Sequence, residues 1–296
     1  MIESYLKEKA SLIDQSLDQI TNELQNVPER LLESMRYSLL AGGKRLRPIL
    51  VLATIESLGK NESIGVPFAC AIEMIHTYSL IHDDLPAMDD DDFRRGRLTN
   101  HKVYGDAMAI LAGDALLTEA FGLIVKGAKQ ANLSQDCLIR ILEDAVCSAG
   151  ASGMVGGQVR DILSDGTKLN LEQLEKIHRH KTGDLIAFSI RTGAHLGQAS
   201  SDTLRALTQF AYYLGLAFQI QDDILDVVGD QEVIGKPVGS DEQKNKATYP
   251  AMLGLDQSRE KLQQLIHEAK ESISHLPDLN PDRLLQIADF LLHRDR

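Results

Sequence analysis

Apolar residues recur along most of the chain at intervals of three and four, the spacing of one face of an α-helix. One such run consists of Leu204, Leu207, Phe210, Leu214 and Phe218. Extended runs rich in β-branched residues are scarce, and no proline interrupts residues 88–235. The pattern predicts an all-α protein of roughly ten or more helices, some of them too apolar to lie at the surface.

Helix boundaries can be placed where breakers interrupt this pattern. Pro48 suits the first turn of a helix that runs to about Leu58, and Pro67 begins another helix. Residues 133–136 and 164–170 have the composition of loops. Internal repeats, low-complexity tracts and long linkers are absent, so we expect a single domain over residues 1–296.

Composition narrows the function classes. Of 296 residues, 43% are hydrophobic and 25% charged, as in an ordinary globular protein. The formal charge of −12 argues against a nucleic-acid partner, which would need a basic surface, and favours metal ions. Cys70, Cys137 and Cys147 form neither a CxxC motif nor a Cys/His cluster, which argues against zinc and disulfides, so we expect small core residues in a reducing compartment.

The N-terminal segment mixes acids, bases and apolar residues at helical spacing and lacks the apolar core of a secretory signal. No run approaches the roughly 18 consecutive apolar residues of a membrane span. We therefore expect a cytoplasmic protein without a membrane-spanning segment.

An acidic cluster stands in the segment GLAFQIQDDILDVVGD, residues 215–230. Asp222 and Asp226 are four apart and continue the apolar stripe that reaches Phe218, and Asp223 is adjacent. Charge on an inward face is costly unless it is paired. The alternative is a helix rotated so that these acids face solvent. Carboxylates without neighbouring histidine or cysteine favour Mg²⁺, which is usually shared with substrate phosphates.

Another cluster, the first in chain order, places six aspartates within residues 83–92, after an apolar run. Ile72, His76, Ser79 and Asp83 follow at spacings of four, three and four, so they share one helix face that becomes polar toward the acids. Pro86 disfavours helix at the preceding residue and lets the chain bend. The EF-hand pattern with its central glycine is absent, which argues against a calcium loop.

Basic groups follow and precede these acids. Arg94 and Arg95 can grip phosphate oxygens, although charge balance on a loop is an equal alternative for this pair. The segment AGGKRLRP places Lys44, Arg45 and Arg47 at a helix start, where backbone N–H groups would complete an anion site. Further candidates are Lys181 and Thr182 in HKTGDL and Lys236 and Lys246 in a Gly/Pro-rich segment. Together they predict two anion sites, one with metal and one without.

The chain resembles the trans-prenyltransferases (isoprenyl diphosphate synthases). The resemblance rests on GGKRLRP, SLIHDDLPAMDDDDFRRG, HKTGDL, GLAFQIQDDILDV and GKPVGSDEQKNKATYP, which occur in the order typical of the family across residues 42–250. It implies the all-α isoprenoid-synthase helical bundle around a large central cavity, usually as a homodimer. The substrates would be isopentenyl diphosphate and an allylic diphosphate, dimethylallyl or geranyl.

The resemblance also implies residue roles. Metal ligands for Mg²⁺, three ions per site with Mn²⁺ as a substitute, would be Asp83, Asp84, Asp89, Asp222, Asp223 and Asp226. The allylic diphosphate would contact Arg94, Lys181, Lys236 and Lys246, and oxygen dipoles of Thr182 and Gln219 would face the allylic cation. The isopentenyl diphosphate site would comprise Gly43, Lys44, Arg47, His76 and Arg95. The resemblance assigns no role to Asp90, Asp91 or Asp92, and none beyond lining the cavity to Gln158 and Asp161.

The implied reaction is a head-to-tail (1′-4) condensation. Metal ions and lysines stabilise the departing diphosphate, an apolar cavity excludes water, and the proton is lost to diphosphate, so no protein base is required. Tyr78 and Ser79 lie about 6–8 Å deeper along the helix than Asp83. In the family, an aromatic residue there with the two-residue-longer first motif goes with a C15 product; C10 and C20 products are alternatives. Tyr78 can equally be a core residue.

Other classes fit less well. A class I terpene cyclase shares one aspartate motif but needs no site like GGKRLRP, and its second motif normally carries Asn, Ser or Thr with Glu. A metal-dependent phosphohydrolase would need more metal-binding histidines than the pair His82–Asp83 suggests, and the remaining histidines form no supporting pattern. A non-catalytic accessory subunit would be expected to lose one aspartate motif, and both are intact.

Overall fold

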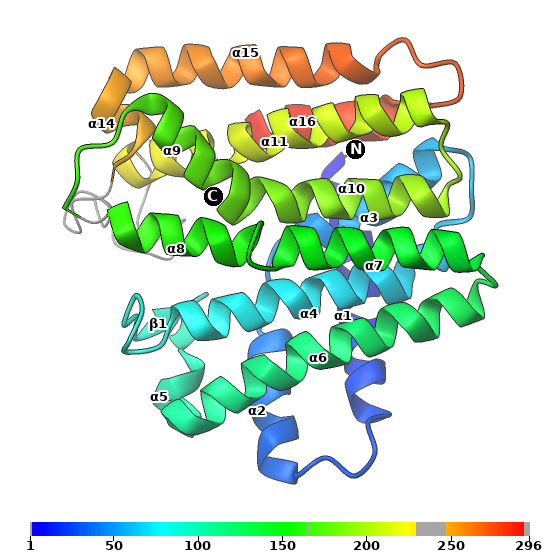
Figure 1. The fold of residues 1–296 in the computed structure, drawn as a ribbon, viewed down its shortest axis with the longest axis vertical. Helices are drawn as coiled ribbons and strands as arrows, with labels where there is room; N and C mark the ends of the chain where they lie inside the picture. The colour runs from blue at the N-terminus through cyan, green and yellow to red at the C-terminus, as the bar shows by residue number, and fades with distance from the viewer. Residues whose placement is uncertain (1, 165, 229–246, 293–296) are drawn as a thin grey trace. The chain divides into compact units, whose positions relative to one another are not determined.

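The computed structural model describes residues 2–164, 166–228 and 247–292, and the described chain is almost entirely helical (Figure 1). The α-helices are α1 (Ile2–Asn22), α2 (Glu29–Leu39), α3 (Leu46–Ser57), α4 (Val66–Asp83), α5 (Asn100–Tyr104), α6 (Asp106–Gln130), α7 (Gln135–Ala149), α8 (Met154–Ser164), α9 (Leu171–His178), α10 (Asp184–Leu196), α11 (Ser201–Val228), α14 (Tyr249–Leu253), α15 (Leu255–Ile273) and α16 (Asp282–Leu292). The predicted all-α class is confirmed.

Three short elements interrupt the α-helices. A 3₁₀ turn spans Glu62–Gly65, and a π-helical turn spans Arg179–Gly183 between α9 and α10. The strands β1 (Phe93–Arg94) and β2 (Arg97–Leu98) form an antiparallel hairpin, with Arg94 opposite Arg97. The expected helix starts are close to the observed ones, since Pro48 lies in the first turn of α3 and Pro67 in that of α4.

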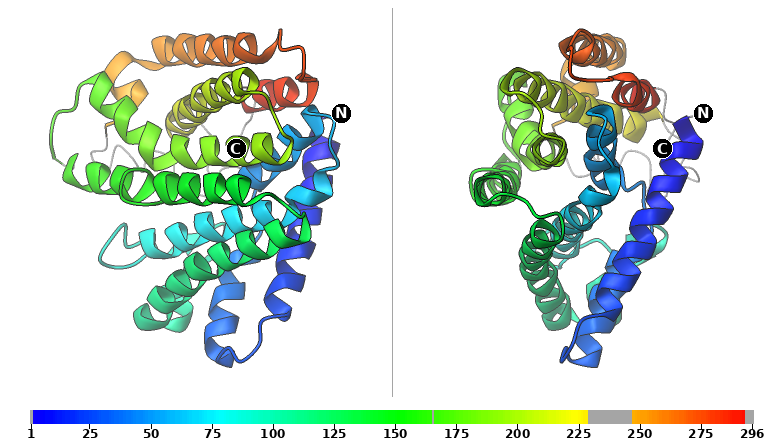
Figure 2. Two further views of the ribbon diagram at one scale, coloured as in Figure 1. Left: turned by 45° about the vertical axis from the view of Figure 1, so that its right-hand side comes forward. Right: turned by 90° about the vertical axis from the view of Figure 1, so that its right-hand side faces the viewer.

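The chain divides into two compact units, Glu3–Leu52 with Asn61–Leu142, and Ala53–Lys60 with Glu143–Arg296. In the first, which we call unit 1, α4 and α6 lie side by side (Figures 1 and 2). Glycines on α6 allow this approach: a Cβ at Gly113 would stand 2.1 Å from Nε2 of His82, and one at Gly127 would stand 2.8 Å from Cβ of Pro67. Apolar side chains of α4, such as Phe68 and Ile75, are fully buried.

In the second unit, unit 2, α11 packs against α10, α15 and α16 (Figures 1 and 2). Leu185 and Phe188 of α10 and Phe210 and Leu214 of α11 are fully buried, so the apolar stripe seen in the sequence is the core face of α11. α8 packs on the π turn. Unit 2 thus fixes the segments that carry HKTGDL and the second aspartate cluster.

Two helical segments have the length and composition of membrane spans. They are Glu62–Asp83, of whose most apolar window 67% is buried in the fold, and Asp106–Gln130, of whose window 39% is buried. The first is the mostly buried core helix α4. The sequence criterion was an uninterrupted apolar run, whereas these two segments match a span by length and mean hydropathy.

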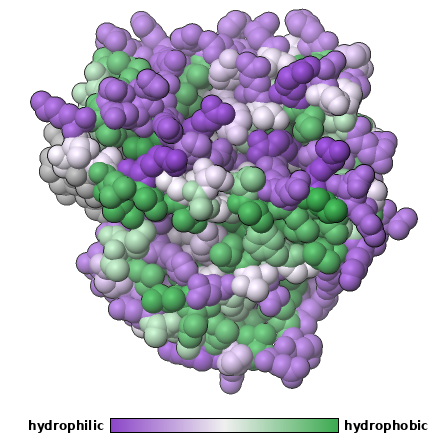
Figure 3. Space-filling model, in the orientation of Figure 1, coloured by the Kyte–Doolittle hydropathy of each residue, from purple (hydrophilic) through white to green (hydrophobic). Residues whose placement is uncertain are grey.

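Exposed apolar side chains gather on particular helices. Ile110 and Leu111 of α6 are 44% and 52% exposed, and Leu163 of α8 is 74% exposed. The space-filling view shows hydrophobic surface over α6, α7 and α8 on the face it displays (Figure 3). These surfaces are where a partner could bury apolar area.

Candidate active site

The first aspartate cluster begins where α4 ends. Asp83 is the last residue of α4, and the backbone N–H of Asp89 donates to the Asp83 carbonyl at 2.9 Å. Asp90 has a positive φ of 50°. The chain therefore bends after Pro86, as the proline predicted, and brings residues six apart in sequence together at the helix end. Asp83 and Asp89 are both partly exposed.

Asp84 differs from these two neighbours because it is buried and bound by an arginine. Arg94 Nε donates to both Asp84 carboxylate oxygens at 2.8 Å, and Nη2 donates to Oδ1 at 2.5 Å. Burial alone would lower the pKa of Arg94, but the hydrogen bonds and charge of Asp84 raise it. A charge-assisted pair of this kind fixes both side chains. The described partner of Asp84 is thus a guanidinium, whereas the sequence assigned it to metal.

Arg94 and Arg95 lie on the hairpin rather than on an irregular loop. Arg95 and Gly96 connect β1 and β2 with φ values of 53° and 74°, which is the type I′ geometry that suits a two-residue hairpin. Thr99 Oγ1 donates to the Asp91 carbonyl at 2.8 Å and ties the hairpin to the aspartate segment. The hairpin therefore places Arg94 against Asp84 and directs Arg95 elsewhere.

In the GGKRLRP segment, one prediction is wrong. Arg45, expected in an anion site, is buried: its Nη1 lies 2.6 Å from Glu73 and its Nε 2.8 Å from Asp14. Burial alone would lower the pKa of Arg45, and these carboxylates raise it. With φ at 51°, Arg45 turns inward directly before α3, which starts at Leu46. It fastens the segment to the core.

The remaining basic groups of unit 1 do come together. Arg47 Nη1 lies 3.2 Å from His76 Nε2, and Arg95 Nη1 donates to the Gly42 carbonyl. Gly43 has φ of 129°, and a Cβ there would stand 2.6 Å from Arg95 Cζ, so glycine lets the guanidinium lie against the backbone. Lys44 lies next to Gly43 in this segment and is exposed.

His76 is held uncharged by this surrounding. Burial first, and then the positive charges of Arg47 and Arg95, hold the pKa of His76 well below its usual value. Burial likewise lowers the pKa of Arg95. Arg47 and Arg95 thus form a concentrated cationic group beside the neutral His76, and an anion would stabilise it.

Tyr78 and Ser79 lie on α4, one turn before Asp83. Tyr78 is 6% exposed, and its ring meets His82 edge to face, with ring centroids 5.7 Å apart. Burial, and after it the Asp83 carboxylate, raise the pKa of Tyr78 to about 12. Ser79 is partly exposed and donates to the His76 carbonyl at 2.8 Å. The tyrosine is rigidly packed and neutral.

The second aspartate cluster lies within the last two turns of α11. Asp223 is buried, and its Oδ2 accepts the backbone N–H of Tyr249 at 3.0 Å. Its Oδ1 accepts Gln219 Nε2 at 3.4 Å. Asp222 and Asp226 are partly exposed. The sequence placed Asp222 and Asp226 on the continuation of the buried stripe, but Asp223 is the buried acid of the three. The alternative in which all three acids face solvent is not observed either, because Asp223 is buried.

Lys181 and Thr182 lie in the π turn between α9 and α10. Lys181 Nζ lies 2.5 Å from Asp161 Oδ2, and Thr182 Oγ1 donates to Gln219 Oε1 at 3.1 Å. Gln219 in turn contacts Asp223, so the proposed cation-facing dipoles and the second aspartate cluster form one network in unit 2. Asp161 had no assigned role. The sequence showed only that Asp161 follows Gln158 by three residues on one helix. Its pairing with Lys181 is seen only in the folded protein.

Lys236 and Lys246 lie outside the described residues. Among the described residues, no group of three or more Asp, Glu, His or Cys side chains forms a ready-made metal cage. Mg²⁺ does not need such a cage, because it keeps several waters and takes one or two carboxylates together with substrate phosphates. The oxygen-only donors Asp83, Asp89, Asp222 and Asp226 fit that ion.

These features define a helical protein with two aspartate clusters. One is bound by the Arg94 guanidinium, and the other accepts hydrogen bonds from the Tyr249 backbone N–H and the Gln219 side-chain amide. The sequence profile of polyprenyl synthetase matches residues 28–280, and the chain belongs to this family.

Individual relatives carry more specific names. The chain is 49% identical to farnesyl diphosphate synthase of Geobacillus stearothermophilus, over 99% of this chain and 98% of that one. It is 44% identical to a chloroplastic geranylgeranyl pyrophosphate synthase of Catharanthus roseus, over 99% of this chain and 81% of that one. The crystal structure of an FPP/GFPP synthase from Zymomonas mobilis aligns with a TM-score of 0.84 at 34% identity, covering 98% of this chain and 99% of that one.

Proposed function

We propose that the protein condenses isopentenyl diphosphate head to tail (1′-4) with dimethylallyl or geranyl diphosphate, giving farnesyl diphosphate and diphosphate. The observation that carries this is the joint presence of two aspartate clusters and a separate cationic group in a member of the polyprenyl synthetase family. The reaction has one substrate that must ionise and one that must not. Two kinds of diphosphate site, one acidic and one basic, suit that requirement.

Isopentenyl diphosphate binds to unit 1. The cations Lys44, Arg47 and Arg95 neutralise its diphosphate, and the neutral His76 contributes a hydrogen bond. Gly43 leaves room for the Arg95 guanidinium. This site lacks the metal-binding aspartates proposed for the allylic site, so it binds the diphosphate without metal assistance to leave.

The allylic diphosphate is bound by both aspartate clusters with Arg94, Lys181, Lys236 and Lys246. Mg²⁺ ions, three per site by analogy and replaceable by Mn²⁺, supply charge that stabilises the departing diphosphate when they are bound. Lys181 carries a proton that contributes a further positive charge at the leaving group. The oxygen atoms of Thr182 and Gln219 orient toward the allylic cation. Diphosphate accepts the proton lost after carbon–carbon bond formation.

Within each cluster, the outer and inner aspartates have different tasks. Asp83, Asp89, Asp222 and Asp226 are partly exposed and hold metal. Asp84 and Asp223 are buried on protein donors and anchor the clusters, Asp84 by fixing Arg94 and Asp223 by fixing the start of α14. This modifies the equal metal-binding role that the sequence assigned to all six.

The product is C15 because Tyr78 closes the pocket one turn below Asp83. Its support is the burial of the Tyr78 ring, which is 6% exposed and contacts His82 edge to face. The second candidate is a C20 product, favoured by the similarity to the geranylgeranyl pyrophosphate synthase. A small residue at position 78 would be expected for that length.

The test is incubation with labelled isopentenyl diphosphate, geranyl diphosphate and Mg²⁺, with the product length determined by chromatography. We expect farnesyl diphosphate. Absence of any condensation product would overturn the enzyme assignment, and a C20 product would overturn the chain-length assignment alone. Tyr78→Ala should give longer products, whereas an unchanged C15 product would mean that the floor lies elsewhere.

We further propose that both units work as one catalytic domain in a cytoplasmic homodimer. The support for the single domain is that the family match extends through both units. The support for a dimer is the apolar surface of α6, where Ile110 and Leu111 are exposed. Light scattering tests it: Ile110→Glu with Leu111→Glu should give monomers, and dimers of unchanged stability would exclude this surface.

A further inference from the structure

We propose that Asp184 is a positioning residue, which holds the π turn Arg179–Gly183 in the form that presents Lys181 and Thr182. The inference rests on the proposed function, in which Lys181 contacts the allylic diphosphate and Thr182 faces the cation. Neither the GGKRLRP segment nor the first aspartate cluster is involved. All residues in the argument lie in unit 2.

The π turn is an extra residue inside an otherwise continuous helix. The backbone N–H of Asp184 donates to the Arg179 carbonyl, five residues earlier, where an α-helix would use the residue four earlier. Such turns are rare inside α-helices, and an irregular backbone of this kind persists only when its surroundings impose it. Something in unit 2 must therefore hold this segment.

Two glycine contacts set the space around the turn. A Cβ at Gly157 of α8 would stand 2.2 Å from the Lys181 backbone nitrogen, and a Cβ at Gly215 of α11 would stand 2.9 Å from the Gly183 Cα. Backbone thus packs on backbone from both sides. These close contacts leave space for the turn, but they include no hydrogen bond that would favour π-helical over α-helical backbone.

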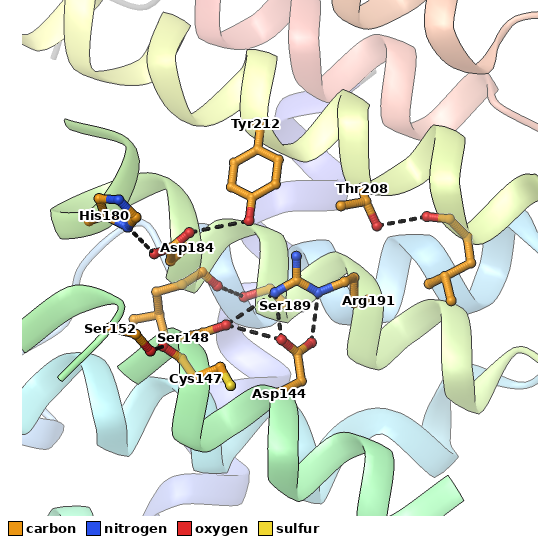
Figure 4. A network of polar contacts seen from close by, with 12 residues as sticks. Asp144, Cys147, Ser148, Ser152, His180, Asp184, Ser189, Arg191, Thr208 and Tyr212 are labelled. Carbon is orange, nitrogen blue, oxygen red and sulfur yellow. Dashed lines mark hydrogen bonds and ion pairs between the residues drawn. The ribbon is translucent and has the colours of Figure 1, made fainter. Parts of the chain in front are cut away.

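Asp184 supplies the directional contacts (Figure 4). Its Oδ2 lies 2.8 Å from Nδ1 of His180, a residue within the turn, and its Oδ1 accepts the Tyr212 hydroxyl at 3.2 Å. The Arg179 guanidinium lies over the Tyr212 ring, 4.2 Å from its centroid. The carboxylate therefore joins the first half of the turn, the first residue of α10 and the adjacent face of α11.

This arrangement determines where the two functional side chains point. Lys181 lies between His180 and Asp184 in the turn and reaches Asp161, and Thr182 reaches Gln219. If the turn relaxed to an α-helix, one residue would shift relative to α10, a rotation of about 100°. Lys181 and Thr182 could not then keep both partners. Misplacement of about 1 Å is enough to cost roughly a hundredfold in rate.

The test compares Asp184→Ala with the matched variant Asp144→Ala. Asp144 also anchors α10 through a half-buried ion pair, because its carboxylate accepts Arg191 Nε at 2.7 Å and Nη2 at 2.5 Å (Figure 4). Both variants remove one carboxylate that binds within α10, but only Asp184 contacts the turn. We expect Asp184→Ala to raise KM for geranyl diphosphate and to lower kcat, each by roughly 10- to 100-fold. KM for isopentenyl diphosphate should stay unchanged, and Asp144→Ala should alter neither KM.

Amide hydrogen exchange gives a readout that does not depend on catalysis. Asp184→Ala should accelerate exchange in residues 179–184 while α15 stays protected, and Asp144→Ala should not. Asp184→Asn, which keeps one acceptor oxygen, should lie between wild type and Asp184→Ala in both measurements. Equal KM values and unchanged exchange in Asp184→Ala would overturn the proposal. If the wild-type protein forms no condensation product, the proposed function fails, and the exchange experiment alone decides whether Asp184 holds the turn.

Discussion

Each of the two aspartate clusters has one buried carboxylate, and the two are held in different ways. In unit 1 the cluster follows the end of α4, where the chain bends and a hairpin arginine binds the inner Asp84. In unit 2 the cluster remains inside the regular helix α11, and a backbone N–H with an amide side chain bind the inner Asp223. A bent segment needs a charged clamp to be well defined, whereas a helix already supplies the spacing and needs only neutral donors.

The largest expected effect separates outer from inner aspartates. Asp83→Ala and Asp222→Ala should each lower kcat by about a thousandfold, because a metal ligand contributes several kcal/mol to stabilising the leaving group. Both should also raise the Mg²⁺ concentration needed for half-maximal activity, with little change in Tm. Steady-state kinetics across a Mg²⁺ titration measure this. If Asp84→Ala changed the Mg²⁺ dependence as strongly as Asp83→Ala, the division between outer and inner residues would be wrong.

The inner aspartates should differ in their effect on stability. Asp84→Ala leaves the Arg94 guanidinium partly buried without its carboxylate and should lower the free energy of unfolding by about 3 kcal/mol. Asp223→Ala removes the acceptor of two neutral donors, the Tyr249 N–H and the Gln219 side-chain amide, and should cost about 1–2 kcal/mol. Urea denaturation gives both values. The double variant Asp84→Ala/Arg94→Ala should be more stable than Asp84→Ala, and the clamp interpretation does not survive if it is less stable.

Gly157 of unit 2 and Gly43 of unit 1 allow the two units to be compared at the backbone. Gly157→Ala would place a Cβ against the Lys181 backbone and should cost about 2 kcal/mol, because backbone cannot move aside. Gly43→Ala meets the end of the Arg95 side chain, which can move, so its stability cost comes from the backbone strain at φ of 129°. It should cost less than Gly157→Ala, about 1 kcal/mol, and raise KM for isopentenyl diphosphate by roughly tenfold. Thermal unfolding and kinetics on both variants check this, and a larger stability loss for Gly43→Ala would contradict it.

The smallest expected effect on stability at neutral pH concerns the buried His178. Burial lowers the pKa of His178 to about 4, from an ordinary value of 6.5. The unfolded chain then binds more protons than the folded one between these values. The stability due to neutral His178 is complete above about pH 6.5 and is lost as the pH falls toward 4. His178→Gln should match wild type near pH 8 and lose less stability by pH 5. Parallel Tm–pH curves would show that His178 does not cause the loss.

Sequence alone predicted the helical class, the helix starts near Pro48 and Pro67, and the bend after Asp83. Those features depend on local spacing and on residues with restricted backbones. It could not predict that Arg45 turns into the core while Arg47 contacts His76, because both are arginines in one short cationic segment. What distinguishes them is the position of Asp14 and Glu73, which bind Arg45 in the folded protein.

Other contacts depended on distant elements. The Asp84–Arg94 pair requires the hairpin to fold back, and the Lys181–Asp161 pair requires α8 to pack on the π turn. The segment HRHKTGDL has the composition of an ordinary helix, and nothing in it signals an extra residue per turn. Glycines on α8 and α11 leave the space for that geometry, and the contacts of Asp184 are the ones that we propose to hold it.

The π turn also governs how this region can vary in length. In a continuous α-helix, the buried face keeps the same register along the whole length. Inserting or deleting one residue therefore rotates every residue beyond it by about 100°. Here the extra residue sits between α9, which buries Leu174 and Ile177 on one face, and α10, which is buried on almost all sides. The two helices therefore follow separate phases. Loss of any one residue from 179–183 would bring α9 into phase with α10 and turn its apolar face away from the core, although the composition of both helices would be unchanged.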